Sequence, residues 1–243
     1  MTLVLFLTLS KAGSITVAVA ANVSYAINDL TEAFNTRYPD TKVKVTLGSS
    51  GKLTAQIKHG APYDLFMAAN MKYPKALYDE GVAVTKPVIY AQGGLAYLSS
   101  KKQDFTQGMS LLSSQKIDKI ALANPKTAPY GKAAVEAMQN GGILKGVEKK
   151  LVYAETISQT VSYAMTAADI GFIAKSSLYS PTMSHFKEGV HWADVDTTLY
   201  TPIDQGIVVL KEGKENSEAI AFYDFIQSDE AKKIFRSFGY LVQ

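Results

Sequence analysis

Four short segments of small, hydroxyl and amide residues are the parts of this chain whose chemistry suits a ligand. They are 21–24 (Ala-Asn-Val-Ser), 48–51 (Gly-Ser-Ser-Gly), 129–131 (Pro-Tyr-Gly) and 155–158 (Glu-Thr-Ile-Ser). Each follows a β-forming run and precedes a run of helical period, so each is expected at a helix N-terminus. The first N–H groups of a helix lack partners within it, and the helix dipole adds partial positive charge there. Four such ends that meet in one cleft would bind an anion.

Ser, Asn and Gly are also ordinary N-cap and turn residues, and for any single segment that structural role is the simpler explanation. The four segments together favour a ligand site. Asn22 and Ser50 would add side-chain donors, and Gly48 and Gly51 would let the backbone approach closely. No arginine lies in the four segments, and Lys52 is expected to be solvated. Neutral dipoles suit a dehydrated oxyanion that is recognised by hydrogen-bond geometry.

Support for catalysis or for a metal site is weaker. The chain has no cysteine and three histidines, His59, His185 and His191. A cationic helix end accounts for His59, and the other two belong to no paired motif. There is no Gly-x-Ser-x-Gly elbow, and Asp194 with Asp196 lacks the glycine and distal glutamate of a calcium loop. We therefore expect a protein that is not an enzyme and offers no direct ligands to a metal ion.

Alternating β-rich runs and helical segments are expected to position the four junctions. The expected strands are 15–20, 42–47, 64–68, 119–123, 150–154, 170–174 and 206–210. The expected helices are about 25–36, a short one closed by Gly60, one ending near 80, then 131–139, 157–166, 215–227 and 229–237. This alternation predicts an α/β fold with parallel strands between helices. Open sheets of this kind bind ligands beyond the carboxyl ends of their strands, which is where the four segments fall.

The long β-rich run 88–98, interrupted by a glycine pair, is expected to cross between two domains. A second extended segment near 206–210 would bring the chain back. These two crossings predict two α/β lobes with hinges near 90–94 and 205–209. Lobe I would comprise 13–91 and 209–243, and lobe II would comprise 92–208.

Composition narrows the class of partner. The 243 residues include 25 Lys plus Arg against 22 Asp plus Glu, and 47% are hydrophobic. Because the charges are spread along the chain, binding to nucleic acid or to an anionic membrane surface is not expected. Residues 3–9 form an apolar run that is too short to span a bilayer and is typical of a signal peptide. Residues 1–12 are therefore expected to be a signal peptide that exports the protein to the periplasm; an N-terminal core strand is the alternative.

The mature chain resembles the periplasmic molybdate-binding proteins of ABC importers over nearly its whole length. The resemblance is carried by segments 15–22, 47–53, 60–69, 124–125, 129–131 and 170–173. It implies a two-lobed type II periplasmic binding protein, each lobe a mixed, mostly parallel sheet flanked by helices. Such a protein captures molybdate, and also tungstate, and delivers it to a membrane permease driven by an ATPase subunit. No cofactor is implied, and we expect a monomer.

The resemblance also implies which residues bind the oxyanion. They are Ala21, Asn22, Ser50, Tyr130 and Ile157. Asn22 would donate through its side chain and Ser50 through both its hydroxyl and its N–H. The other three would donate through backbone N–H groups.

One position departs from the family pattern. Ala174 stands where many members place a ligand-binding tyrosine, and Asn22 is expected to replace that contact. The departure leaves open the relative affinities for molybdate and tungstate. A binder of sulfate or of another small oxyanion is the alternative function, and a hydrolase or transferase that uses the same cleft is a third hypothesis.

Overall fold

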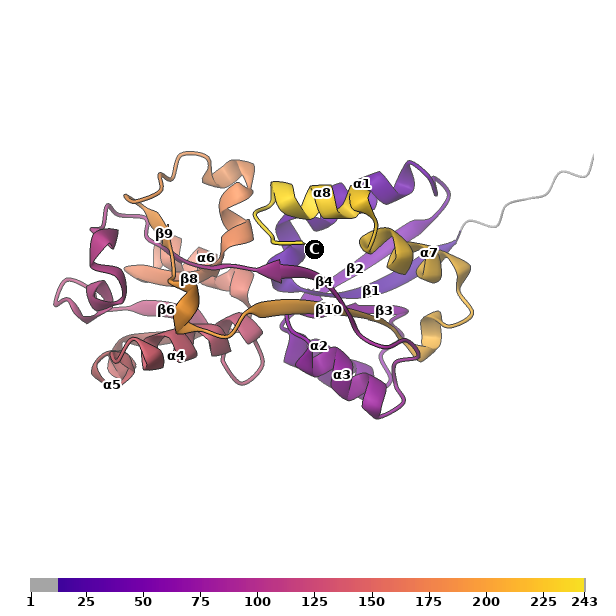
Figure 1. Ribbon diagram of the computed structural model, residues 1–243, viewed down its shortest axis with the longest axis horizontal. Coiled ribbons are helices and arrows are strands. Elements are labelled where there is room, and N and C mark those ends of the chain that lie inside the picture. The colour runs from indigo at the N-terminus through magenta and orange to yellow at the C-terminus, as the bar shows by residue number, and fades with distance from the viewer. Residues whose placement is uncertain (1–12, 243) are drawn as a thin grey trace, which may run out of the picture.

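The structure, a computed structural model, describes residues 13–242, and the expected signal peptide lies outside the described residues. It contains two five-stranded sheets, one in each half of the molecule, and helices flank both (Figure 1). The strand orders are β2-β1-β3-β10-β4 and β7-β6-β8-β5-β9. The expected α/β fold class with two mixed sheets is confirmed. Among residues 13–242, no helix has the length and apolar character needed to cross a membrane.

The first sheet is built from both ends of the chain. Its strands are β1 (Ser14–Ala20), β2 (Lys42–Gly48), β3 (Leu65–Met67), β4 (Val88–Gly93) and β10 (Ile203–Val209). Its helices are α1 (Ile27–Asn35), α2 (Ser50–Lys58), α3 (Lys72–Asp79), α7 (Ser217–Ile226) and α8 (Asp229–Ser237), with the 3₁₀ helices η1 (Ala21–Tyr25) and η7 (Lys211–Gly213). Strand β1 pairs in parallel with β2 and β3, whereas β10 is antiparallel to β3 and β4.

The second sheet is built from the middle of the chain. Its strands are β5 (Leu95–Leu98), β6 (Ile120–Ala123), β7 (Leu151–Ala154), β8 (Ile170–Ala174) and β9 (Trp192–Asp194). Its α-helices are α4 (Pro129–Asn140), α5 (Leu144–Val147) and α6 (Ile157–Thr166). Its 3₁₀ helices are η2 (Phe105–Ser113), η3 (Glu148–Lys150), η4 (Lys175–Tyr179), η5 (Pro181–Met183) and η6 (Thr197–Leu199). Strand β6 is parallel to β7 and β8, and β5 is antiparallel to β8 and β9.

Strand β1 shows why helices cover both faces of a sheet. Successive side chains of a strand point to opposite faces. Ile15, Val17 and Val19 accordingly join one buried cluster with α1, α7 and α8, whereas Ala18 joins another with α2 and α3. These two groups of helices lie above and below the first sheet in Figure 1. A central strand that is buried on both faces reads as a continuous apolar run, as this one does.

Antiparallel pairing is more frequent than the helix–strand alternation suggested. In each sheet, two pairs of adjacent strands are parallel and two are antiparallel. The antiparallel pairs all involve β5 or β10, the strands that carry the chain into the second sheet and back into the first. The sequence also gave no sign of β9, because its three residues lie in a stretch without alternating polarity.

The chain passes from the first sheet to the second between β4 and β5, and returns at the start of β10 (Figure 1). The first crossing lies close to the hinge expected near 90–94, whereas the second precedes Ile203 and so lies before the hinge expected near 205–209. The two hinges stay predictions. Between the paired strands β4 and β10 the register shifts: Gln205 lies opposite Ala91, but Gly206 lies opposite Ile89. Tyr90 is thus an extra residue on β4, the arrangement of a β-bulge. The division into lobes at 91/92 and 208/209 stays a prediction; β10 joins the first sheet from Ile203 onward.

Candidate anion-binding site between the sheets

The five expected binding residues come together in one pocket between the two halves of the molecule. The pocket is lined by Ala20, Ala21, Asn22, Gly48, Ser49, Ser50 and Ala69 from the first half and by Ala128, Pro129, Tyr130 and Ile157 from the second. None of these described lining residues carries a charged side chain. That these residues bind an anion stays a prediction, but the fold brings together what the sequence placed far apart.

The pocket is small. The cavity volume open to the centre of a water molecule is about 10 Å³. A cavity of that volume has room for about one water molecule.

Ser50 is held so that its hydroxyl is available to donate. The residue is 1% exposed and opens helix α2. Its Oγ accepts a hydrogen bond of 2.9 Å from the N–H of Ala69, another residue of the pocket wall. Because that bond occupies an acceptor site of the oxygen, the hydroxyl hydrogen remains free for an acceptor in the pocket.

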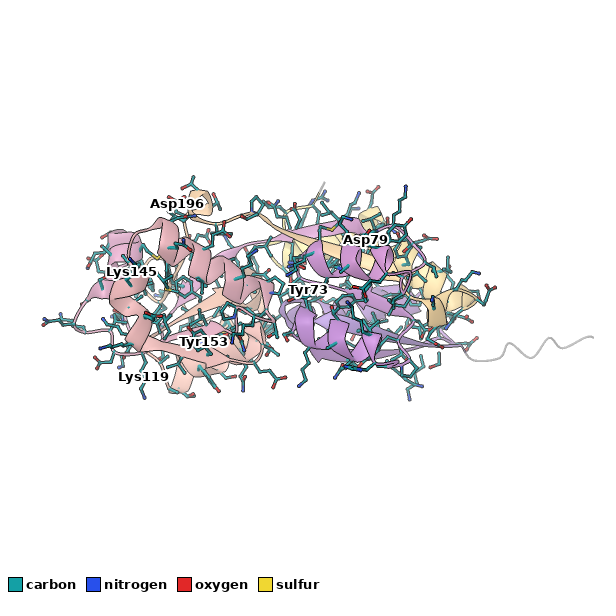
Figure 2. The ribbon with its side chains drawn as sticks, turned by 90° about the horizontal axis from the view of Figure 1, so that it is seen from below. Tyr73, Asp79, Lys119, Lys145, Tyr153 and Asp196 are labelled. Atoms are coloured by element: carbon teal, nitrogen blue, oxygen red, sulfur yellow. The ribbon has the colours of Figure 1, made fainter. Side chains whose placement is uncertain are left out.

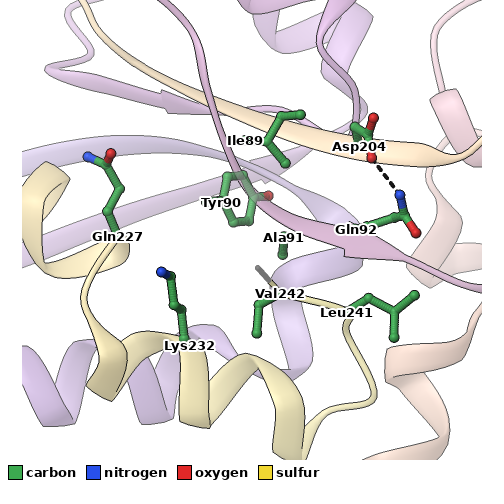
Figure 3. A pocket seen from close by; sticks show the side chains of 9 residues that line it. All are labelled: Ile89, Tyr90, Ala91, Gln92, Asp204, Gln227, Lys232, Leu241 and Val242. Atoms are coloured by element: carbon green, nitrogen blue, oxygen red, sulfur yellow. Dashed lines mark hydrogen bonds between the residues drawn. The ribbon is translucent and has the colours of Figure 1, made fainter.

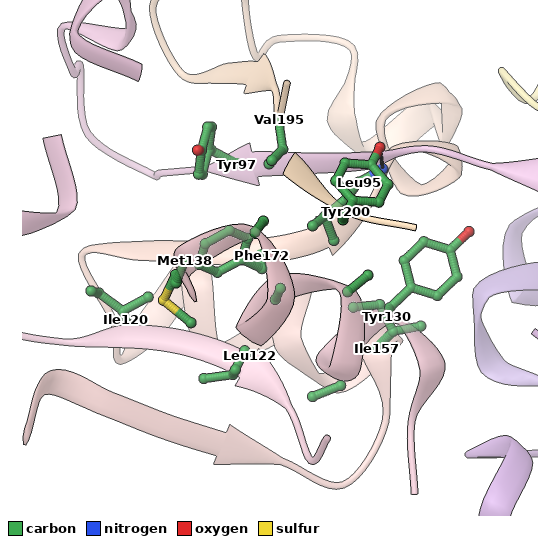
Figure 4. Close-up of a cluster of buried hydrophobic side chains, with 14 of the residues drawn as sticks. Leu95, Tyr97, Ile120, Leu122, Tyr130, Met138, Ile157, Phe172, Val195 and Tyr200 are labelled. Atoms are coloured by element: carbon green, nitrogen blue, oxygen red, sulfur yellow. Dashed lines mark hydrogen bonds between the residues drawn. The ribbon is translucent and has the colours of Figure 1, made fainter. Parts of the chain in front are cut away.

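Three helix N-termini supply backbone donors at the pocket. Ser50 is the first residue of α2, Tyr130 the second of α4 and Ile157 the first of α6. Their N–H groups cannot bond within their own helices. The hydrogen bonds among the described residues include none from these three groups. Figure 4 shows Tyr130 and Ile157 at the edge of the second half's buried cluster, on the side facing the first half.

Helix α6 is fixed at this end by its cap. The side chain of Thr156 accepts a hydrogen bond from the N–H of Gln159, as an N-cap residue does. The Ile157 side chain is 5% exposed and packs into the apolar cluster of the second half. Its N–H is therefore held in place by a capped helix and a buried side chain.

Asn22 lies fully buried in η1, directly after β1. Its Nδ2 donates to Oε1 of Gln205 at 2.8 Å and to the hydroxyl of Tyr240 at 3.2 Å. Its Oδ1 has no hydrogen-bond partner among the described residues. Its carbonyl oxygen accepts from Tyr240 and from Ser176, which lies in the second half of the molecule.

Ser49 is a candidate that the sequence did not single out. It is 4% exposed, lines the pocket, and its Oγ has no partner among the described residues. It precedes α2 but makes no capping bond with its side chain. The pattern Gly-Ser-Ser-Gly contains two hydroxyls. Ser49 is recognised as a second possible donor only because its Oγ has no hydrogen-bond partner among the described residues. Ala174 is buried and does not belong to the pocket wall.

Direct contacts join the two halves beside the pocket. The N–H of Gly51 donates to the carbonyl oxygen of Thr127 at 2.8 Å. A Cβ on Gly51 would lie 2.9 Å from Cα of Thr127, so only glycine fits this approach without displacement. Lys52 forms an ion pair with Glu155 across the halves, and both side chains are exposed. Tyr73, on the side of the first half that faces the second in Figure 2, donates to the carbonyl oxygen of Lys126 at 3.5 Å.

The tyrosines that surround Asn22 are neutral at physiological pH. Burial raises the pKa of Tyr90 and of Tyr130 well above the ordinary value, and it raises the pKa of Tyr240 to about 12. Their hydroxyls therefore act as hydrogen-bond donors and acceptors and add no negative charge next to the pocket.

The alternative chemical groups lie elsewhere. His59 ends α2, and Asp194 is paired with Lys175. Asp196 accepts from Thr198 at the start of η6. Among residues 13–242 no three His, Asp or Glu side chains gather as a metal site would require.

A larger hollow of about 440 Å³ lies against β4, α8 and the C-terminal segment (Figure 3). Its polar groups include Gln92 and Asp204, which bond to each other at 2.7 Å, and Lys232. It contains none of the five expected residues, and the helix N-termini of α2, α4 and α6 do not contribute to it.

Comparison with known proteins assigns the family. The family model described as bacterial extracellular solute-binding protein matches residues 15–241. The chain belongs to this family. Among solute-binding proteins, it is 36% identical over 236 residues to the molybdate-binding protein ModA of Rhodobacter capsulatus, covering 96% of this chain and 90% of that protein. It is 34% identical over 238 residues to ModA of Azotobacter vinelandii, covering 96% and 92%.

Solved structures of solute-binding proteins share the fold. The periplasmic molybdate-binding protein of Azotobacter vinelandii superimposes with a TM-score of 0.86 at 28% identity, covering 94% of this chain and 99% of that one. The sulfate-binding protein SubI of Mycobacterium tuberculosis superimposes with a TM-score of 0.78 at 14% identity, a likeness of fold alone. The expected two-sheet architecture of a periplasmic binding protein is thus confirmed.

Proposed function

We propose that this protein captures molybdate, and also tungstate, in the pocket between its two lobes and delivers it to the permease of an ABC importer. The observation that carries the proposal is the convergence of three helix N-termini with the hydroxyl of Ser50 and the side chain of Asn22 on one uncharged pocket. The proposed ligand residues are the five expected from the sequence, joined by Ser49.

The chemistry of the pocket fits a fully deprotonated tetrahedral oxyanion. Backbone N–H groups and hydroxyls at helix N-termini stabilise negative charge without a counter-ion. Each of the four ligand oxygens needs donors, and a ligand that carries its own proton would need an acceptor instead. Phosphate carries a proton at neutral pH and is therefore expected to bind weakly.

The remaining parts of the proposal follow from the transport role. Residues 1–12 would be removed as a signal peptide, and the mature protein would act in the periplasm as a monomer. It would bind the ion between lobe I (13–91 and 209–243) and lobe II (92–208) and present it to a permease that an ATPase subunit drives. Neither catalysis nor a cofactor has a part in this function. The relatives named molybdate-binding proteins support the choice of ligand.

Thermal unfolding in the presence of an anion panel tests the proposal. A ligand that binds only the folded state adds RT ln(1 + [L]/Kd), which is about 4 kcal/mol at 1,000 times Kd. Molybdate and tungstate are expected to raise Tm by much more than sulfate and phosphate do at equal concentration. Equal shifts for sulfate and molybdate would favour the alternative of a general small-oxyanion binder. No shift with molybdate would contradict the proposal.

A further inference from the structure

Gln205 is a fully buried amide that connects the two halves of the proposed site without lining the pocket. It lies in β10, one of the two strands at the crossing. Its Oε1 accepts from Asn22 Nδ2 and from the hydroxyl of Tyr90, each at 2.8 Å. Its Nε2 donates to the hydroxyl of Tyr130 at 3.1 Å. One side chain thus links an expected ligand residue of each lobe.

In this arrangement Asn22 has the wrong polarity for an anion. Its nitrogen is directed at Gln205 and Tyr240, neither of which belongs to the pocket wall. The side-chain atom left without a partner among the described residues is the oxygen. An amide oxygen next to an oxyanion is repulsive, since both are acceptors. For Asn22 to donate to the ion, its amide group must turn so that nitrogen and oxygen exchange places.

Such a turn cannot occur in Asn22 alone. If only Asn22 turned, its Oδ1 would face Gln205 Oε1 across the present 2.8 Å contact, and two buried acceptors would oppose each other. If Gln205 turns as well, its Nε2 donates to Asn22 Oδ1 and to the hydroxyl of Tyr90. Its Oε1 then accepts from the hydroxyl of Tyr130, whose hydrogen can rotate toward it.

The surrounding hydroxyls can follow this exchange without losing partners. Tyr90 already lies 3.4 Å from the carbonyl oxygen of Ala68 and can donate there. Tyr240 can donate to Asn22 Oδ1, because Ser176 continues to satisfy the carbonyl oxygen of Asn22 at 3.0 Å. In the turned arrangement every buried group of the network except Asn22 Nδ2 has a partner, and Asn22 Nδ2 becomes free for a ligand.

We infer that Gln205 is a specificity-determining positioning residue: its amide turns together with that of Asn22, so that Asn22 presents a donor to a deprotonated oxyanion. This inference rests on the proposed function. The backbone is adapted to this side chain. The register of the β4–β10 pair shifts directly after Gln205, and a Cβ on Gly93 would overlap both Gln205 Nε2 and the hydroxyl of Tyr130.

Neutron diffraction of deuterium-exchanged crystals, grown without ligand and with molybdate, tests the inference directly because it distinguishes amide nitrogen from oxygen. Without ligand, the deuterium atoms of Asn22 Nδ2 are expected to point to Gln205 and Tyr240. With molybdate, they are expected to point to the ion, and those of Gln205 Nε2 to Asn22 Oδ1 and Tyr90. Molybdate in the pocket with Gln205 unturned would overturn only this inference. Absence of molybdate from the pocket would overturn the proposed function and this inference with it.

A substitution supplies the second test. Gln205→Glu keeps the shape of the side chain, but an ionised carboxylate can only accept, so it holds Asn22 Nδ2 away from the ion. Molybdate affinity is expected to fall at least about tenfold at pH 8 and to recover as pH falls, because protonation restores a donor. Gln227→Glu adds the same charge after helix α7 (Figure 3) without contacting Asn22, and is expected to stay within about threefold of wild type. Equal losses in the two variants, or none in Gln205→Glu, would overturn the inference.

Discussion

At the proposed site, Ser50 is the residue on which side-chain recognition is expected to depend most. Its hydroxyl accepts from Ala69 and keeps its hydrogen for the pocket. Ser50→Ala deletes one charge-assisted hydrogen bond to the ion. It should weaken molybdate binding by about 1.5 to 3 kcal/mol, or roughly 10- to 150-fold. Calorimetric titration of the variant, after circular dichroism has shown a native spectrum, measures the loss.

Ile157 provides the contrast between side-chain and backbone recognition. Ile157→Ala keeps the N–H and should weaken binding less than Ser50→Ala, provided that the fold survives the lost apolar volume. Ser50→Asp should abolish binding, because a carboxylate would face a dianion. If Ile157→Ala is as damaging as Ser50→Ala, or if Ser50→Asp still binds molybdate tightly, Ser50 does not belong to the site.

Tyr240 links the network around Asn22 to stability at high pH. Burial raises the pKa of its hydroxyl from 10.0 to about 12, so the folded state favours the protonated form. That stabilisation is complete below pH 10 and is lost as pH rises from 10 toward 12, on the order of 2 kcal/mol for this group. Denaturant unfolding of wild type and Tyr240→Phe across this range should show a shallower fall in the variant. If the free energy of unfolding falls equally with pH in wild type and in Tyr240→Phe, the raised pKa of Tyr240 does not contribute to stability.

At the scale of elements, the N-terminus of α2 must approach the loop before α4 for the site to close. The N–H of Gly51 bonds to Thr127, and a Cβ there would also lie 2.8 Å from the hydroxyl of Tyr73. Gly51→Ala should hold the halves apart and weaken molybdate binding by about 1 to 3 kcal/mol. Gly146→Ala is the matched control, since a Cβ there meets no atom within 4 Å. Equal affinities of both variants by calorimetry would show that this contact has no role in binding.

The elements near the site were largely predictable from sequence, because they depend on local signals. Strand β1 and helix α6 lie where apolar periodicity and turn residues placed them. The even mixture of parallel and antiparallel pairs was not predictable, since strand order is decided by contacts between distant segments. The same holds for Gln205, whose three partners, Asn22, Tyr90 and Tyr130, are 183, 115 and 75 residues away. In sequence it is one glutamine in a β-rich run.

The signal for Ser49 was ambiguous for a different reason. Hydroxyl residues before a helix are usually caps, and local pattern cannot tell a cap from a ligand. Only the absence of a partner for its Oγ among the described residues separates the two roles. The sequence therefore shows that Ser49 precedes a helix, but only the structure shows that its hydroxyl is available to a ligand.

At the scale of the whole molecule, the proposed site takes residues from both halves of the chain's fold. Ser50 and Asn22 lie on one side, and Tyr130 and Ile157 on the other. If the proposed site is correct, release and capture of the ion would require the lobes to move about the crossing strands. Small-angle scattering should show a smaller radius of gyration when molybdate is added. An unchanged radius, with binding demonstrated in the same sample, would argue against closure.

The most direct test of the account is anomalous diffraction at the molybdenum edge from crystals grown with molybdate. The account predicts one anomalous peak per chain, within hydrogen-bond distance of the Ser50 hydroxyl, the Asn22 side chain and the N–H groups of Tyr130 and Ile157. A peak at any other place on the protein, or no peak in crystals soaked to saturation, would contradict it.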